Sequence, residues 1–268
     1  MPFLSVSGRK TYYEIHGSHA GVPLLLLQGI AGSCRGWLPL QVPAFSKQLR
    51  TLITDLRGVG QSEDPGGPFT TADLADDTAA FLDALGVERA HVLGTSMGGM
   101  VAQELALRHP ARVDRLILVG TYAKPDARRR LLLEHWKDLT QLNVPTTYRI
   151  RERLVWTLQD ETLEQRDLID GMVEFYTREG EPSPPDVFAR QCDACLAHDT
   201  LSRLHEIPHR TLVLCGRQDA FTPPRLHRQI ADEIPRADLV TLAYGAHLVM
   251  AESARAFNEV VLRFLTAR

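Results

Sequence analysis

The chain has 268 residues, of which 44% are hydrophobic and 24% are charged, which is the composition of an ordinary globular protein. Its 30 basic and 33 acidic side chains give a formal net charge of −3, too close to neutral for electrostatic binding of nucleic acid. The chain lacks the roughly 20 consecutive apolar residues of a membrane helix, shows no signal-peptide pattern, and has too few cysteines (four) for a disulfide scaffold.

The first two predicted strands form a hairpin. Residues 3–6 and 11–15 flank a turn at Ser7-Gly8, which predicts an antiparallel pair at the edge of a sheet. Six later apolar runs are β-branched and leucine-rich without strict alternation, which is typical of parallel strands buried on both faces. These runs predict strands at residues 23–27, 49–54, 90–94, 115–119, 211–215 and 238–242.

Helices are predicted between these strands. The first begins at a capping threonine, Thr70 or Thr71, and ends at Gly86. Further helices are predicted from Met97 to about His109, after Pro223-Pro224, and from Ser253 to near the C-terminus. The alternation of strands and helices predicts an α/β fold with a mostly parallel eight-stranded sheet covered by helices.

The segment 122–208 interrupts this alternation. It contains no convincing strand and carries aromatic residues at helical spacing, which predicts several helices inserted between two core strands. We therefore expect a core formed by residues 1–121 and 209–268, and a helical cap, or lid, formed by residues 122–208. Such an insertion should lie over the carboxyl edge of the sheet, where open α/β folds bind ligands. Within it, residues 179–186 contain three prolines and a glycine and predict an exposed loop.

Gly94-Thr95-Ser96-Met97-Gly98 is a G-x-S-x-G motif between a predicted strand and a predicted helix. In this position the motif indicates a nucleophile elbow, because glycines at both ends permit a sharp turn that holds the serine hydroxyl above the sheet. The N-terminus of the following helix favours negative charge formed beside it. The alternative interpretation is a serine that only caps the helix.

A serine nucleophile requires a base and a group that orients the base. His247 follows the last predicted strand and Asp219 follows the strand 211–215, so both should lie at the same sheet edge as Ser96. Asp126 is the rival acid, and a solvated loop residue is the alternative interpretation of His247. Five other histidines fall on polar or helix-surface stretches: His135, His198, His205, His209 and His227.

These residues resemble the α/β-hydrolase fold family over nearly all of the chain outside the insertion. The segment 55–62, Asp-Leu-Arg-Gly-Val-Gly-Gln-Ser, is similar to the D-x-R-G-x-G-x-S loop of these enzymes, and residues 96–102 and Gly245-Ala246-His247 with Glu252 also match. The chain looks most like small esterases, 3-oxoadipate enol-lactonases and cofactor-free haloperoxidases. The resemblance implies an oxyanion hole formed by the backbone N–H groups of Ile30 and Met97, with no metal and no organic cofactor.

One position departs from the family pattern. The family usually has His-Gly after the third strand, whereas this chain has Gln28-Gly29. The oxyanion donors are main-chain groups, so the substitution does not remove them. We expect the Gln28 side chain to hydrogen-bond to neighbouring backbone and to hold the loop.

Together these features predict a cytoplasmic serine hydrolase that cleaves a small or medium carboxylic ester or lactone, with no nucleic-acid or membrane partner. Carbon–carbon bond hydrolysis of a diketone-type substrate is one alternative, and a ligand receptor that retains the triad is another. Gln28, Trp136 and Trp156 are candidate substrate-binding residues. The arginines of the insertion could bind a substrate carboxylate, but such runs more often form a solvated helix face: Arg128, Arg129, Arg130, Arg149, Arg151 and Arg153. Cys192 and Cys195 lack the further ligands of a zinc site, so ordinary packing is expected for them.

Overall fold

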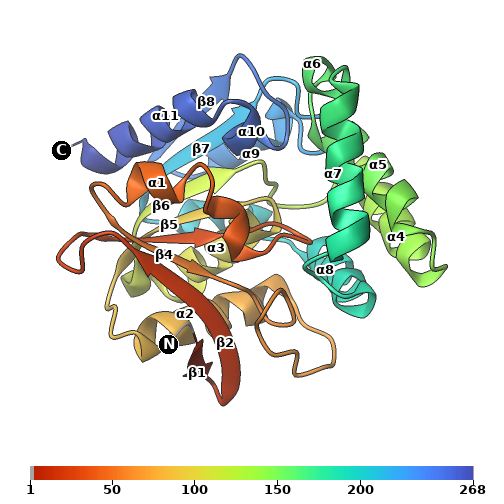
Figure 1. Cartoon of the computed structure of the whole chain (residues 1–268). Helices are drawn as coiled ribbons and strands as arrows, with labels where there is room; N and C mark the ends of the chain where they lie inside the picture. Colours follow the sequence, from red (N-terminus) through yellow and green to blue (C-terminus); the bar gives the residue numbers. More distant parts are fainter. Residues whose placement is uncertain (1–2, 268) are drawn as a thin grey trace.

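A computed structural model of the chain describes residues 3–267. Its strands form one eight-stranded sheet in the order β1-β2-β4-β3-β5-β6-β7-β8 (Figure 1). The first pair is the predicted antiparallel hairpin, β2 is also antiparallel to β4, and every later pair is parallel. The predicted fold class is therefore confirmed. The strands are β1 (Phe3–Val6), β2 (Arg9–His16), β3 (Pro23–Leu27), β4 (Arg50–Thr54), β5 (Ala90–Thr95), β6 (Val113–Val119), β7 (Arg210–Gly216) and β8 (Ala237–Leu242).

Helices cover both faces of this sheet. Neighbouring residues of a strand point to opposite faces, so Leu25 and Leu27 of β3 join one apolar core while Leu24 and Leu26 join the other. The first core is closed by α2 (Thr71–Ala84), α3 (Met97–Arg108) and α9 (Pro224–Glu233). The second is closed by α1 (Val42–Phe45) and α11 (Ala254–Thr266). Short elements complete the core: η1 (Cys34–Trp37), η2 (Pro110–Arg112), η3 (Leu201–Glu206) and α10 (Val249–Glu252).

The predicted helix boundaries follow from local chemistry. Thr70 caps α2, where its hydroxyl accepts from the Asp73 N–H and the Asp73 carboxylate accepts from the Thr70 N–H. The helix ends just before Gly86, whose φ of +66° suits glycine. Within residues 3–267 no helix has the length and apolar character needed to cross a membrane.

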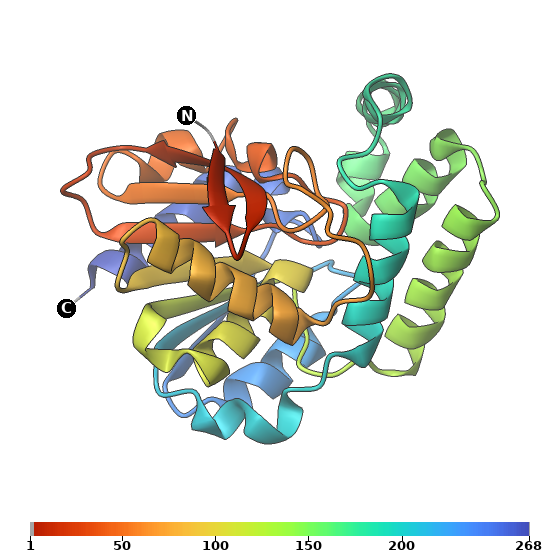
Figure 2. The ribbon, with the colours of Figure 1, turned by 90° about the horizontal axis from the view of Figure 1, so that it is seen from below.

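Between β6 and β7 the described chain forms helices and no strand. The α-helices of this segment lie together at one side of the sheet (Figure 1 and Figure 2), whereas η3 packs against α3 and α9 of the core. The two ends of the insertion meet where the Thr200 N–H donates to the carbonyl of Ala123 at 2.9 Å. We keep the term cap for residues 122–208. Its helices are α4 (Ala127–Gln141), α5 (Thr146–Thr157), α6 (Asp160–Leu163), α7 (Arg166–Glu179) and α8 (Pro185–Ala197).

The predicted exposed loop at residues 179–186 is confirmed for most of its length, since residues 179, 180 and 184–186 are exposed. The loop itself is short, and the Glu181 and Ser183 side chains in it are buried. The segment packs against the loop that follows β4, where the Gly60 N–H donates to the Pro182 carbonyl at 2.8 Å. Proline content indicated irregular backbone correctly, but it carries no information about what that backbone packs against.

All four cysteines are free and buried. Cys192 and Cys195 lie on the buried side of α8 and belong to the apolar core. This agrees with the prediction that the two cysteines serve ordinary packing. Burial raises the pKa of Cys195 to about 12 and raises the pKa values of Cys34, Cys192 and Cys215 as well. Each thiol therefore stays protonated at neutral pH.

Glycine substitutions test the close approach of α3 to the sheet. A methyl group at Gly98 would lie 2.6 Å from the carbonyl oxygen of Gln28, whereas one at Gly171 of α7 would have nothing within 4 Å. We expect Gly98→Ala to lower the free energy of unfolding by about 1–3 kcal/mol, because neither backbone segment has room to move. Gly171→Ala, the matched control, should raise it by up to about 1 kcal/mol through helix propensity. Urea unfolding measures both, and equal effects of the same sign would contradict this packing.

Candidate active site

Ser96 occupies a strained turn between β5 and α3. Its φ of 53° and ψ of −120° are unusual for a residue with a side chain. Two hydrogen bonds of 2.8 Å hold this backbone: the Ser96 N–H donates to the Val119 carbonyl, and the Thr121 hydroxyl donates to the Ser96 carbonyl. A methyl group at Gly29 would lie 2.8 Å from Ser96 Cβ, so the loop after β3 passes directly beside the serine.

His247 and Asp219 meet at the ends of β8 and β7. His247 Nδ1 lies 3.0 Å from Asp219 Oδ2, and both side chains are buried. Thr222 completes the arrangement, because its N–H donates to Asp219 Oδ1 at 2.6 Å and its hydroxyl to Oδ2 at 2.7 Å. The carboxylate is thereby fixed on both oxygens. Asp126, the rival acid, instead caps α4 and pairs with Arg225.

Ser96 and His247 line one cavity of about 930 Å³, here called the main cavity. Within residues 3–267 the ring of His247 has hydrogen bonds only to Asp219 and Thr222, and none to the Ser96 hydroxyl. Hydrogen bonds between a serine and its base are often long without a substrate and shorten in the substrate complex. The fold therefore brings all three predicted side chains to one site, with the contact between Asp219 and His247 already formed.

The loop that carries His247 is held by the cap and by α10. Glu252 accepts from the Ala246 N–H at 2.7 Å and from the Gln159 N–H at 3.0 Å. Gln159, at the start of α6, in turn accepts from the Gly245 N–H at 2.7 Å. The Glu252 match noted in the sequence thus has a structural meaning: its carboxylate ties the histidine loop to the cap.

The backbone N–H groups of Ile30 and Met97 have no acceptor among the described residues. Ile30 lines the main cavity and Met97 begins α3 directly after Ser96. Ala31, the residue after Ile30, has a strained backbone with a φ of +59°. The Ala31 N–H donates to Gln191 Oε1 of α8 at 3.1 Å, and the Ser183 hydroxyl donates to the same oxygen at 3.1 Å. A cap residue therefore holds the loop that carries the candidate oxyanion donor.

Gln28 turns back onto its own loop. Its Oε1 accepts from the Gly29 N–H at 3.3 Å, and a methyl group at Gly36 would lie 2.8 Å from its Nε2. Asp55 supports the same loop from the D-x-R-G-x-G-x-S segment, where it accepts from the N–H groups of Cys34 at 2.8 Å and Gln61 at 3.0 Å. Gln28 also lines the main cavity.

The two tryptophans proposed for substrate binding differ in position. Trp136 lines the main cavity and stacks on Phe221 at 4.9 Å, and Phe221 lies edge-on to the His247 ring at 4.9 Å. Trp156 is not among the residues that line the cavity, because its indole N–H donates to Glu152 and its ring packs against the core. The two tryptophans therefore differ in whether they line the main cavity, and this difference comes from tertiary packing.

Arg153 is the insertion arginine that reaches the main cavity. It pairs with Glu181, which also pairs with Arg149 at 2.9 Å. Arg151 points away and pairs with Asp170 on the surface. Within residues 3–267 no cluster of three or more histidine, cysteine or acidic side chains is arranged to hold a metal ion.

Three histidines expected on polar surfaces are buried: His198, His209 and His227. The ring of His227 accepts from the Thr121 N–H at 3.0 Å through Nε2, directly behind the backbone that holds Ser96. Burial lowers the pKa of His227 to about 4 and that of His198 to about 3, so both rings are neutral. His227 lies three and seven residues before Ile230 and Ile234, a helical spacing that could have indicated its buried position.

Comparisons with known proteins agree with this architecture. The profile of the alpha/beta hydrolase fold family matches residues 22–254. Carbamate hydrolase RutD of Azorhizobium caulinodans is 32% identical over 98% of both chains. The enol-lactonase structure from Burkholderia xenovorans has a TM-score of 0.90 and 28% identity over 99% of this chain and 100% of that one. Non-heme bromoperoxidase BpoC of Mycobacterium tuberculosis has a TM-score of 0.87 and 31% identity over 95% of both.

The buried neutral state of His227 predicts a loss of stability in acid. Its folded-state pKa of about 4 lies below the ordinary value of 6.5, so the unfolded chain takes up the proton first as the pH falls. The stabilisation is complete above about pH 6.5 and is lost toward pH 4, at up to about 1.4 kcal/mol per pH unit for one such histidine. Urea unfolding between pH 4.5 and 6.5 should show a smaller slope for His227→Gln, whose amide oxygen can still accept from Thr121. Exposed His205→Gln is the control, and equal slopes for wild type and His227→Gln would refute the assignment.

Proposed function

The chain belongs to the α/β-hydrolase fold family, and on that premise we propose that it is a serine hydrolase that cleaves a small or medium carboxylic ester or lactone. The main support is the buried Asp219–His247 pair in the same cavity as Ser96, which lies on a strained strand-to-helix turn. Such strain persists only where the surrounding structure enforces it, and it concentrates at reacting groups.

The proposed reaction is acyl transfer in two halves. His247 Nε2 takes the proton from the Ser96 hydroxyl as the serine oxygen bonds to the substrate carbonyl carbon. The N–H groups of Ile30 and Met97 donate to the carbonyl oxygen, which becomes the oxyanion of a tetrahedral intermediate. The bond to the leaving oxygen then breaks, and His247 returns the proton to that oxygen. Water repeats the same steps on the acyl-enzyme and releases the carboxylic acid and free Ser96.

Each supporting contact has a part in this scheme. Asp219 accepts the Nδ1 proton of His247, so Nε2 faces the serine as a base and the imidazolium is stabilised when it forms. The two oxyanion donors are unpaired N–H groups, one of them at the N-terminus of α3. The scheme uses no metal and no organic cofactor.

The size and lining of the main cavity support a small or medium substrate. A volume of about 930 Å³ is at the upper end of the range usual for small-molecule sites. Trp136 and Phe221 form an apolar wall next to His247. The relatives named as an enol-lactonase and a carbamate hydrolase also take substrates with a heteroatom on a carbonyl carbon.

A substrate panel with matched variants tests the proposal. Ser96→Ala should lower kcat by about 10⁴- to 10⁶-fold on the ester or lactone that wild type prefers, because the nucleophile is gone. The panel contains carboxylic esters, lactones, carbamates and dienol diketones, so it separates acyl transfer from carbon–carbon cleavage. Exposed Ser202→Ala is the control for a lost hydroxyl, and urea unfolding checks that both variants fold. Undiminished turnover by Ser96→Ala would eliminate the proposal.

Gln191 is a positioning residue in this scheme, since it fixes Ala31 next to the Ile30 donor. Gln191→Leu removes the acceptor, so we expect kcat on a short ester to fall by about 10- to 100-fold, less than the loss of a whole oxyanion donor. KM should change little, and the affinity for a trifluoromethyl ketone, which forms a tetrahedral adduct, should fall in parallel with kcat. A rise in KM with kcat unchanged, or no loss of affinity for the trifluoromethyl ketone, would contradict the role.

A further inference from the structure

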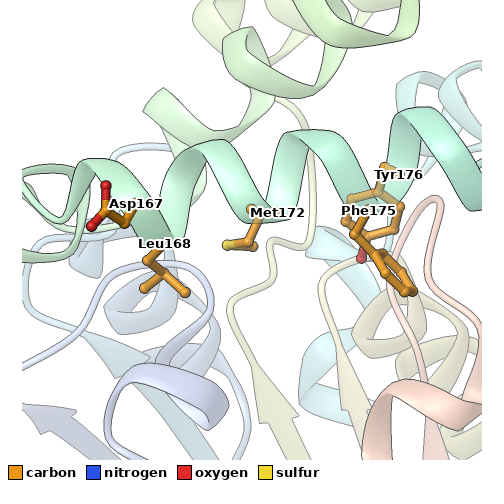
Figure 3. A pocket seen from close by; sticks show the side chains of 6 residues that line it. Asp167, Leu168, Met172, Phe175 and Tyr176 are labelled. Carbon is orange, nitrogen blue, oxygen red and sulfur yellow. The ribbon is translucent and has the colours of Figure 1, made fainter.

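Helix α7 has apolar side chains that are not buried against the rest of the protein. Ile169 and Val173 pack against α5 in a small core of the cap. Leu168 and Phe175, in contrast, are 46% and 52% exposed. Leu168, Met172 and Phe175 follow one another along one side of the helix (Figure 3).

These side chains line a shallow, open hollow of about 360 Å³ whose lining residues all lie on α7, and it is here called the α7 groove. Met172, Phe175 and Tyr176 line both this groove and the main cavity that contains Ser96. Phe175 is held against Tyr176, with their rings edge to face at 5.3 Å. The groove thus begins where the main cavity reaches α7, and its lining ends at the carboxylate of Asp167.

We propose that the α7 groove is a subsite for an unbranched apolar chain of the substrate. The inference rests on the proposed function and names its substrate class: esters of medium-chain aliphatic acids, whose carbonyl lies at Ser96 and whose tail leaves the main cavity along α7. From Tyr176 to Leu168 the helix rises about 12 Å, which suits an extended chain. Two exposed apolar side chains are far too little surface for a stable protein interface of roughly 1,000 Å² or more.

Gly171 offers a way to fill the groove without disturbing the fold. It lines the groove, and nothing lies within 4 Å of the position of a Cβ atom there. Gly171→Phe therefore places an aromatic ring in the path of the tail while improving the helix propensity of α7. Glu174→Phe is the matched control, because Glu174 lies on the same helix, is exposed, and is not part of the groove lining.

The test is a chain-length series of 4-nitrophenyl esters from acetate to decanoate. For wild type, kcat/KM should rise by about two- to fourfold for each methylene that reaches the groove. Gly171→Phe should lower the ratio of kcat/KM for decanoate to that for acetate by about tenfold or more, since several such methylenes lose their site. Glu174→Phe should leave the ratio as in wild type. An equal ratio in Gly171→Phe and wild type overturns the subsite.

A binding measurement separates the subsite from the proposed function. Calorimetric titration of Ser96→Ala with the intact decanoate ester requires no turnover. Adding Gly171→Phe to Ser96→Ala should weaken decanoate binding and leave butanoate binding similar, even if ester hydrolysis itself fails in the panel. If hydrolysis depends on Ser96 but Gly171→Phe changes neither the chain-length ratio nor the binding of decanoate, the proposed function stands and the subsite is rejected. A dimer in sedimentation that Gly171→Phe dissociates, with an unchanged chain-length ratio, would assign the groove to a second copy of the chain.

Discussion

The lack of space between β3, β5 and the start of α3 determines the rest of the site. Gly94, Gly98 and Gly29 stand where a methyl group would overlap a neighbouring atom, so the loop after β3 can lie directly against Ser96. The same crowding holds Ser96 in a backbone conformation that costs about 1–3 kcal/mol, which the large apolar core on both faces of the sheet can offset. Ser96 and Ile30 consequently both line the main cavity, and Met97 follows Ser96 as the first residue of α3.

The cap does more than cover this edge, because it hydrogen-bonds to both loops that carry the candidate groups. Gln191 holds Ala31 beside the candidate oxyanion donor, and Gln159 holds Gly245 just before His247. The Thr157 carbonyl also accepts from the Leu248 N–H at 3.0 Å. In the proposed mechanism, a substitution in the cap that admits a different substrate would therefore also act on the backbone next to the candidate catalytic groups.

The strands, the main helices and the three candidate side chains could be predicted because their signals are local. Leucine-rich runs mark buried strands, the glycines around Ser96 mark a sharp turn, and parallel strands deliver Asp219 and His247 to one edge. The contacts of Gln191 could not be predicted, and neither could the finding that Trp136 but not Trp156 lines the main cavity, since both depend on how cap helices pack against distant parts of the chain. Gln191 lies three residues after Phe188 and four after Val187, on the same buried face of α8. This spacing indicates that Gln191 is buried, but it does not show that Ala31 is its hydrogen-bond partner.

The buried, protonated thiols make this protein a convenient subject for site-directed labelling. Because all four native cysteines are enclosed and have raised pKa values, maleimides should react with them slowly in the folded state. A cysteine that replaces the exposed Tyr148 of α5 would then be the fast-reacting position, and no native cysteine would have to be removed. A fluorophore attached there would report any change around α5 when a ligand is added to a chain that carries this single substitution.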